Sequence, residues 1–473
     1  MNFSEEYFDD YNSYISEEEI KSKIDLCRSY IDSGQILSNL DLIEDTIQLC
    51  LEYDYIEDGL YLTDAVLQVA PYNSDTWQFK GIFLNNSFDF EEAYKCFQKA
   101  LSLNPNDVDS YINISIAEDN LGMFEEAIES LNKALSIEPN NEETLYSLGL
   151  LYERKEKYED AIYNFKKALE IDPTFVEAWY ELGYCYENSD KLEEALKAYE
   201  IYLDYEPDSY TAWYNKGIVH LRLEEWKKAI DAFEFSIALK EDFSSSWFNC
   251  GYAYFKLGKF NDALNAYKKA YELDRDDETI LFNMGQTYEE MGSFYNAIKC
   301  YNEAIKLDPE YYEAYLARGY CYDSIGKYQL ALKDFNTAIS LTSNPEDAWY
   351  AKADLEYSLG QLQDSVESYK KAIEINPDNF SAWFKLAETY FEMGRWIESL
   401  NAYDECLRLK PDYAGIYYNK AKINFLLSHT QQAIDCLKKA FELDPDIKNE
   451  FTKDYPDVKS SKLFIKLLEE NKS

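Results

Sequence analysis

The sequence has few basic residues and no long hydrophobic run, and these two shortages exclude several classes of function. Its 473 residues contain 46 Lys and Arg against 90 Asp and Glu, giving a formal net charge of -44. Such an acidic surface repels the phosphate backbone of nucleic acids and the anionic face of most membranes. No run of about 18 apolar residues occurs, as a membrane-spanning helix would need. We therefore expect neither nucleic-acid binding nor direct membrane insertion.

Features of export and of disulfide bonding are also missing. The opening stretch MNFSEEYFDDYNSYISEEE contains no Lys or Arg and no apolar core of the kind that a secretory signal needs. The nine cysteines include no C-x-x-C pair, and the chain is far too long to depend on disulfides for a stable core. We therefore expect a soluble, cytoplasmic protein with reduced thiols.

Tryptophan, in contrast, recurs with a constant period. The separations between Trp77, Trp179, Trp213, Trp247, Trp349 and Trp383 are all multiples of 34 residues. A 34-residue period is the signature of a helix-turn-helix solenoid. Eleven repeats of this length fit residues 74–447 without insertion or deletion. We number the positions of each repeat as places 1 to 34, with Ser74 at place 1 of repeat one.

The same residue types return at the same places in most repeats. A large side chain stands at place 4 and a small one at place 8, which lets two helices approach closely. Glycine at place 15 predicts a left-handed turn that ends the first helix. Small residues at places 20 and 27, with an aromatic or Leu at place 24, predict a second amphipathic helix. Proline at place 32 then predicts the end of that helix. Repeat four shows most of the pattern, with Trp179, Leu182, Gly183, Tyr186, Ala195, Tyr199 and Pro207.

This series resembles the consensus of the tetratricopeptide repeat family, and the whole chain is similar to long bacterial scaffold proteins of that family. The resemblance covers about four-fifths of the chain. It implies an all-α fold, a right-handed α-solenoid superhelix of 34-residue helix-turn-helix repeats. The departures are mild: Glu118 and Glu356, for example, replace the usual aromatic at place 11.

The flanking segments extend the same architecture. Residues 1–39 are expected to form an acidic N-terminal capping region, because Ser16 and Glu19 fit a capping box and Ile20, Ile24 and Cys27 share one helix face. Residues 40–73 keep part of the repeat pattern and are interpreted as a degenerate repeat, followed by the eleven repeats of residues 74–447. Residues 448–473 are expected to form a C-terminal capping helix that covers the last repeat with Phe464, Leu467 and Leu468.

The sequence contains no assembled catalytic, metal or cofactor motif. His220 stands at place 11, which Tyr fills in most other repeats, so we interpret it as a packed core residue; His429 lies in an expected turn. The cysteines follow the repeat register without forming a ladder of metal ligands. Gly319 to Gly326 has the wrong spacing for a phosphate loop, and Lys327 is followed by Tyr328 instead of Ser or Thr. We expect a protein that is not an enzyme and that needs neither metal nor cofactor.

The family resemblance directs attention to the inner wall of the solenoid. In such repeats the first helix forms a concave groove through places 2, 5, 6, 9, 12 and 13, and this groove holds peptides or partner segments. Here place 5 is mostly aromatic, and those rings are either exposed in the groove or packed between helices. Asn recurs at place 6, where its amide can bond a peptide backbone. The candidate partner-binding residues are Tyr180, Tyr184, Tyr214, Asn215, Phe248, Asn249, Tyr252, Phe255, Lys256, Phe282, Asn283, Glu289, Tyr320, Asp323, Tyr350 and Asp354.

The charges in this groove indicate which class of partner to expect. Carboxylates outnumber cations and alternate with Tyr and Phe, which suits Lys or Arg side chains through ion pairs and cation-π contacts. We therefore predict a non-catalytic scaffold or adaptor that binds extended or helical protein segments of basic or mixed charge. The alternative is a regulatory or targeting subunit of an enzyme or of a secretion or envelope assembly, docked through its terminal helices. The sequence indicates no particular oligomeric state.

Overall fold

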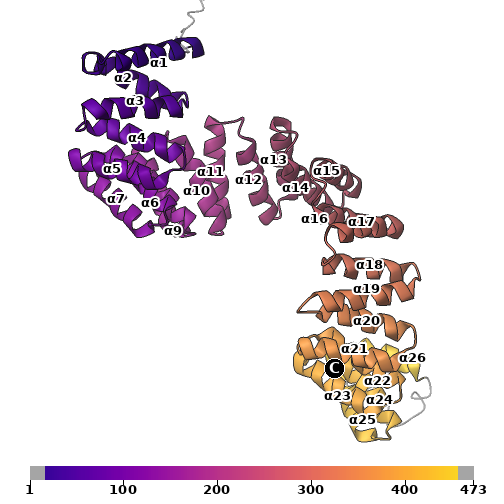
Figure 1. Cartoon of the computed structure of the whole chain (residues 1–473). Coiled ribbons are helices and arrows are strands. Elements are labelled where there is room, and N and C mark those ends of the chain that lie inside the picture. The colour runs from indigo at the N-terminus through magenta and orange to yellow at the C-terminus, as the bar shows by residue number, and fades with distance from the viewer. Residues whose placement is uncertain (1–15, 456–473) are drawn as a thin grey trace, which may run out of the picture. The chain divides into compact units, whose positions relative to one another are not determined.

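The computed structural model describes residues 16–455, which form 26 α-helices and one short 3-10 helix and contain no strand. The chain separates into two compact units, residues 1–240 and 241–473. Within each unit, helix hairpins follow one another along the chain (Figure 1). The all-helical repeat fold is therefore confirmed.

The first unit begins with α1 (Glu17–Asp32) and η1 (Ile36–Asn39), and hairpins follow. Their helices are α2 (Leu40–Glu52), α3 (Ile56–Val69), α4 (Ser74–Asn86), α5 (Phe90–Leu103), α6 (Val108–Asn120), α7 (Phe124–Ile137), α8 (Glu142–Arg154), α9 (Tyr158–Ile171), α10 (Val176–Asn188), α11 (Leu192–Tyr205), α12 (Tyr210–Arg222) and α13 (Trp226–Leu239).

The second unit consists of further helix hairpins and ends in a short helix. Its helices are α14 (Ser244–Lys256), α15 (Phe260–Leu273), α16 (Glu278–Glu290), α17 (Phe294–Leu307), α18 (Tyr312–Ser324), α19 (Tyr328–Leu341), α20 (Glu346–Ser358), α21 (Leu362–Ile375), α22 (Phe380–Glu392), α23 (Trp396–Leu409), α24 (Ala414–Leu426), α25 (Thr430–Leu443) and α26 (Ile447–Asp454). In all eleven repeats the first helix, helix A, occupies places 1 to 13 and the second, helix B, places 17 to 30.

The hairpin core depends on a glycine and a ring. In repeat three, a Cβ added to Gly149 at place 8 would lie only 2.4 Å from the Phe165 ring at place 24. A Cβ added to Gly285 in repeat seven would lie at the same distance from the Tyr301 ring. Both rings are completely buried. The small residue at place 8 is therefore needed because the aromatic ring of helix B lies directly against the backbone of helix A.

The turn between the two helices has the left-handed residue expected at place 15. In repeat six, Gly258 has φ 72°, and its N–H donates to the Phe255 carbonyl at 2.9 Å. Repeats without glycine there adopt the same conformation, as Glu156 does with φ 57°. The turn geometry is thus a property of the repeat, and glycine only lowers its conformational cost.

A side-chain hydrogen bond ties many repeats to the turn before them. The Trp213 indole N–H donates to the Pro207 carbonyl at 2.9 Å, across the junction of repeats four and five. The equivalent bond to the carbonyl six residues earlier is made by Trp77, Trp179, Trp247 and Trp383. In repeat eleven, the Tyr417 hydroxyl donates to the Pro411 carbonyl instead. Leu145 and Leu281 stand at this place in repeats three and seven and cannot donate. Six of the eleven repeats are therefore tied to the preceding turn by this bond.

The ends of the described chain are covered by α1 and α26. At the N-terminus, the Ser16 hydroxyl accepts from the Glu19 backbone N–H, and Ile20, Ile24 and Cys27 are buried in one cluster with α2 and α3. At the other end, Ile447 and Phe451 of α26 pack against the last hairpin. The expected covering residues Phe464, Leu467 and Leu468 lie outside the described residues.

Candidate functional site

The candidate binding residues fall on one face of helix A in each unit. We call the side chains at places 2, 5, 6, 9, 12 and 13 the helix-A face. In the first unit, α10 and α12 carry Tyr180, Tyr184, Tyr214 and Asn215 on this face. In the second unit, α14, α16, α18 and α20 carry the candidates from Phe248 to Asp354. Two sets of candidate residues result, one in each unit.

The aromatic residues at place 5 pack against helix B. The ring centroids of Phe248 and Tyr267 lie 5.7 Å apart, and those of Phe282 and Tyr301 lie at the same distance. Tyr180, Tyr214, Tyr350 and Phe384 pair with the ring at place 24 in the same way, at 5.8 to 5.9 Å. These side chains are half-buried. The sequence left open whether the place 5 rings are exposed in the groove or packed between helices. The structure favours packing, so these rings do not form a continuous exposed aromatic surface.

The tyrosines at place 9 are more accessible. Tyr184 is 38% exposed and Tyr320 is 39% exposed. Glu153 and Glu187 lie near enough to Tyr184 to raise the pKa of its phenol, after the larger effect of burial. Burial, followed by Asp347 and Asp354, raises the pKa of Tyr320 to about 12. Each unit thus presents an accessible phenol ring among carboxylates.

The asparagines at place 6 are less available to a partner than the sequence suggested. The Asn283 side-chain N–H donates to the Thr279 carbonyl at 2.8 Å within its own helix. Asn249 donates to the Ser245 carbonyl at 3.0 Å in the same manner, and Asn215 donates to the Tyr180 hydroxyl at 3.0 Å. One amide N–H of each side chain is therefore already used.

The carboxylates at place 12 are half-buried and hydrogen-bonded in several repeats. In repeat seven the Tyr301 hydroxyl donates to Glu289 Oε2 at 2.9 Å, and in repeat four the Tyr199 hydroxyl donates to Glu187 Oε2 at 3.3 Å. Burial raises the pKa of Glu289, and the hydrogen bond from Tyr301 partly opposes this effect. These carboxylates are therefore held in place by the fold.

Repeat three places two acids together. Glu153 at place 12 faces Glu181 at place 6 of the next repeat, and the Cys185 thiol lies 3.8 Å from Glu153 Oε2. Burial and then repulsion from Glu181 raise the pKa of Glu153 to about 8. Burial also raises the pKa of Glu181. The arrangement favours one proton held between the two carboxyl groups near neutral pH.

A pocket opens on the helix-A face of repeats nine to eleven, and none of its lining residues is among the candidate partner-binding residues predicted from the sequence. Its volume is about 190 Å³, and it is lined by Tyr357, Glu388, Phe391, Glu392, Tyr403, Asn419 and Lys422. The sequence does contain a signal for this pocket, because place 12 is aromatic in Tyr357 and Phe391, whereas five of the eight earlier repeats have an acid there. We call this cavity the repeat 9–11 pocket.

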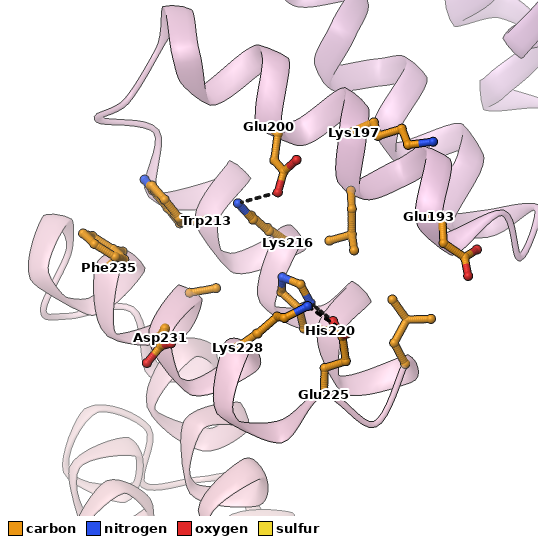
Figure 2. Close-up of a pocket in the computed structure, with 13 residues that line it drawn as sticks. Glu193, Lys197, Glu200, Trp213, Lys216, His220, Glu225, Lys228, Asp231 and Phe235 are labelled. Carbon is orange, nitrogen blue, oxygen red and sulfur yellow. Dashed lines mark hydrogen bonds and ion pairs between the residues drawn. The ribbon is translucent and has the colours of Figure 1, made fainter.

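A larger pocket, of about 620 Å³, lies in the first unit between α11, α12 and α13 (Figure 2). His220 lines it, and its Nδ1 lies 2.7 Å from Glu225 Oε2. Burial lowers the pKa of His220, and the contact with Glu225 opposes this. The side chain is 6% exposed, which agrees with a packed histidine. The neighbouring charges pair as Lys216 with Glu200 and Lys228 with Glu225. No Ser, Thr or Cys nucleophile lines the pocket.

Among residues 16–455, no three His, Cys, Asp or Glu side chains are grouped so that they could hold a metal ion. Within the same range, no helix has the length and apolar character that crossing a membrane requires. None of the nine cysteines, all of which lie within residues 16–455, forms a disulfide bond.

Repeated helix hairpins, a helix-A face of half-buried rings and carboxylates, and a 34-residue period define an α-helical repeat protein of the interaction-scaffold type. Family models described as TPR repeat or Tetratricopeptide repeat match most of the chain. The chain belongs to the tetratricopeptide repeat family. The matched residues are 74–107, 96–129, 120–156, 154–190, 186–242, 251–292, 279–311, 300–333, 353–394, 387–428 and 414–447.

Several solved structures are similar to the chain. A crystal structure of MamA protein is 21% identical, with a TM-score of 0.34, over 35% of this chain and 91% of that one. The APC/C hetero-tetramer Cut9-Hcn1 is 14% identical, with a TM-score of 0.37, over 90% and 96%. A tetratricopeptide repeat protein from Parabacteroides merdae is 18% identical, with a TM-score of 0.43, over 52% and 98%. None of the curated proteins compared matches the chain.

Proposed function

We propose that the protein is a non-catalytic scaffold or adaptor that binds protein segments of basic or mixed charge on its helix-A face. Tetratricopeptide repeats generally bind protein or peptide partners, and the accessible phenols of Tyr184 and Tyr320 carry the more specific part of the proposal. Each lies among carboxylates, and a Lys or Arg side chain can contact the ring face and an acid together.

The net charge of the whole chain supports the same partner class. At -44, the molecule attracts basic segments over long distances and accelerates their encounter at low ionic strength. The five cations of the helix-A face do not reverse this, because four of them bond to the chain's own acceptors and Lys256 lies over the Tyr252 ring. Arg222, for example, donates to the Glu187 carbonyl at 2.6 Å and to Asp190 Oδ1 at 2.9 Å.

The terminal helices offer less support for the alternative of docking through the chain ends. Ile20, Ile24 and Cys27 of α1, and Ile447 and Phe451 of α26, are buried against their neighbouring hairpins. Their apolar faces therefore already serve the stability of the solenoid. We propose the helix-A face as the principal binding surface.

The test is affinity purification from the native cell with Tyr184→Ala plus Tyr320→Ala. Both rings are partly exposed, and because Tyr320 also packs against Phe335 with ring centroids 5.4 Å apart, thermal melting is used to show that the variant is folded. The matched control is Tyr163→Ala plus Tyr295→Ala, which removes rings that are 59% and 65% exposed on helices B. We expect the first variant to lose most co-purified partner and the control to retain it. Equal recovery with both variants would contradict the proposal.

A further inference from the structure

The repeat 9–11 pocket combines aromatic walls with two carboxylates. We propose that it takes one Arg side chain of the segment bound to the helix-A face, so this assignment rests on the proposed function. Three consecutive helices A build the pocket. Tyr357 comes from α20, Glu388, Phe391 and Glu392 come from α22, and Asn419 and Lys422 come from α24. Tyr403 of α23 closes its base and is 2% exposed.

The volume of the pocket limits its occupant to a single side chain. At about 190 Å³, it has room for roughly six water molecules of ~30 Å³ each, far less than a helix or a folded loop needs. The Asn419 side-chain N–H donates to the Tyr403 hydroxyl at 3.1 Å, so the base is held by a bond between α24 and α23. A long side chain entering from the helix-A face can therefore fill a cavity that already exists.

The carboxylates retain capacity to accept hydrogen bonds. Glu388 Oε2 accepts from Lys385 Nζ at 3.1 Å, and Glu392 Oε1 accepts from the Tyr357 hydroxyl at 2.5 Å. Within residues 16–455, the second oxygen of each carboxylate has no hydrogen-bond donor from the chain. These bonds orient both groups and leave two acceptor oxygens for a cationic ligand.

Lys422, which lines the pocket, forms an ion pair with an acid of α26. Lys422 Nζ lies 3.0 Å from Asp454 Oδ2 and 4.0 Å from the centroid of the Tyr418 ring. The Tyr418 hydroxyl also donates to Asp454 Oδ2, at 2.8 Å. The ammonium group is thus neutralised by α26, and its repulsion toward an incoming cation is reduced. The surroundings of the pocket remain acidic.

Arg fits these features better than Lys. Its planar guanidinium can lie against a ring such as Phe391, which is 36% exposed, and can bond two acceptor oxygens through its fork of N–H groups. Lys offers a compact ammonium that is more strongly hydrated and does not stack in this way. We therefore expect Arg to be favoured at one position of the bound segment and Lys to be accepted with lower affinity.

The experiment selects peptides on the intact protein from a random 12-residue display library. Wild type and Glu388→Gln plus Glu392→Gln are used in parallel, and thermal melting followed by circular dichroism shows that both are folded. We expect Arg to be enriched at one position on wild type and this enrichment to disappear with the variant. The matched control is Glu310→Gln plus Glu367→Gln, which makes the same charge change at exposed acids away from the pocket and should preserve the enrichment.

A synthetic peptide with a selected sequence then tests the contribution of its Arg side chain to binding. Replacing its Arg by citrulline, which keeps the shape and removes the charge, should weaken binding to wild type by about tenfold or more, in keeping with a charge-assisted hydrogen bond. With Glu388→Gln plus Glu392→Gln, the same replacement should change Kd less than twofold. Selected peptides without Arg, or an equal citrulline effect on both proteins, would overturn the pocket assignment and leave the proposed function intact. Failure to select any peptide on wild type would overturn both.

Discussion

Repeats three and seven contain the same acid in two different settings. Both have Leu at place 4, Gly at place 8 and Glu at place 12, and in both the next repeat has Cys at place 10. In repeat seven the ring at place 24 is Tyr301, whose hydroxyl donates to Glu289. In repeat three it is Phe165, which has no hydroxyl, and Glu153 faces Glu181 instead. The hairpin backbone is the same, but the proton affinity of the acid differs.

The difference shows that the interior and the helix-A face follow separate constraints. Packing requires a ring at place 24, and both Phe and Tyr satisfy it. The hydroxyl reaches the helix-A face, so that one atom decides whether a half-buried carboxylate receives a hydrogen bond from a phenol. A donor favours the charged form, whereas a second acid favours protonation. Carboxyl groups on the helix-A face of one protein can therefore differ in charge at the same pH.

The largest effect on stability should come from replacing the glycine at place 8, which both repeats share. Gly149→Val or Gly285→Val would force the ring of Phe165 or Tyr301 away from the helix-A backbone, and we expect a loss of about 3 kcal/mol. Repeat seven should lose more, because moving Tyr301 also breaks its bond to Glu289. Urea unfolding and local hydrogen exchange measure both losses. A loss below about 0.5 kcal/mol would show that the rings can move freely.

The next effect should come from removing only the phenol oxygen of repeat seven. Tyr301→Phe leaves Glu289 half-buried without its donor, so we expect a loss of about 1–3 kcal/mol at neutral pH. The pKa of Glu289 should rise, because the removed bond favours its charged form. The control is Tyr295→Phe, which changes an exposed tyrosine of the same helix. Equal effects would contradict a special role for the Tyr301 hydroxyl.

A smaller, pH-dependent effect should distinguish repeat three. The pKa of Glu153 is about 8 in the folded state against 4.5 as the ordinary value, so the folded chain binds more protons between these pH values. Its contribution to the free energy of unfolding therefore falls as the pH rises from about 4.5 to about 8. Allowing for partial exposure, we expect a fall of about 1–2 kcal/mol. Denaturant titrations at several pH values should show it in wild type and not in Glu153→Gln.

The smallest effect should come from giving repeat three the donor of repeat seven. Phe165→Tyr places a hydroxyl near Glu153, and we expect the pKa of Glu153 to fall while stability changes by less than about 1 kcal/mol. Titration followed by carbon NMR of the Glu153 carboxyl measures the shift. An unchanged pKa would mean that Glu181, and not the missing phenol, controls the acid of repeat three.

Much of the fold was predictable because packing repeats strictly. The period, the ring at place 24 and the small residue at place 8 are set by one hairpin geometry, so eleven copies reinforce the same signal. The turn was predicted from glycine, although Phe88, Glu156, Asp190, Glu224 and Ser428 adopt positive φ there without it. Cooperative packing of the hairpin overrides the local preference at those residues.

The candidate site was less predictable, because a helical face does not reveal how its side chains bond. Asn283 looked available by its place, yet it bonds the carbonyl four residues earlier. The repeat 9–11 pocket depends on three successive helices and on Lys422 pairing with Asp454 of α26. Such a cavity arises from contacts between repeats, which the pattern of a single repeat does not contain.

The bond from the place 4 indole to the preceding turn has a mechanical consequence. At joints such as Trp213 with Pro207, a directional bond resists sliding of one repeat over the next. Leu145 and Leu281 provide only apolar contact, which gives way with little change in energy for small displacements. We expect a load applied to the two ends to be absorbed first at joints of the leucine type. We expect the six joints with this hydrogen bond to be stiffer than the two leucine joints.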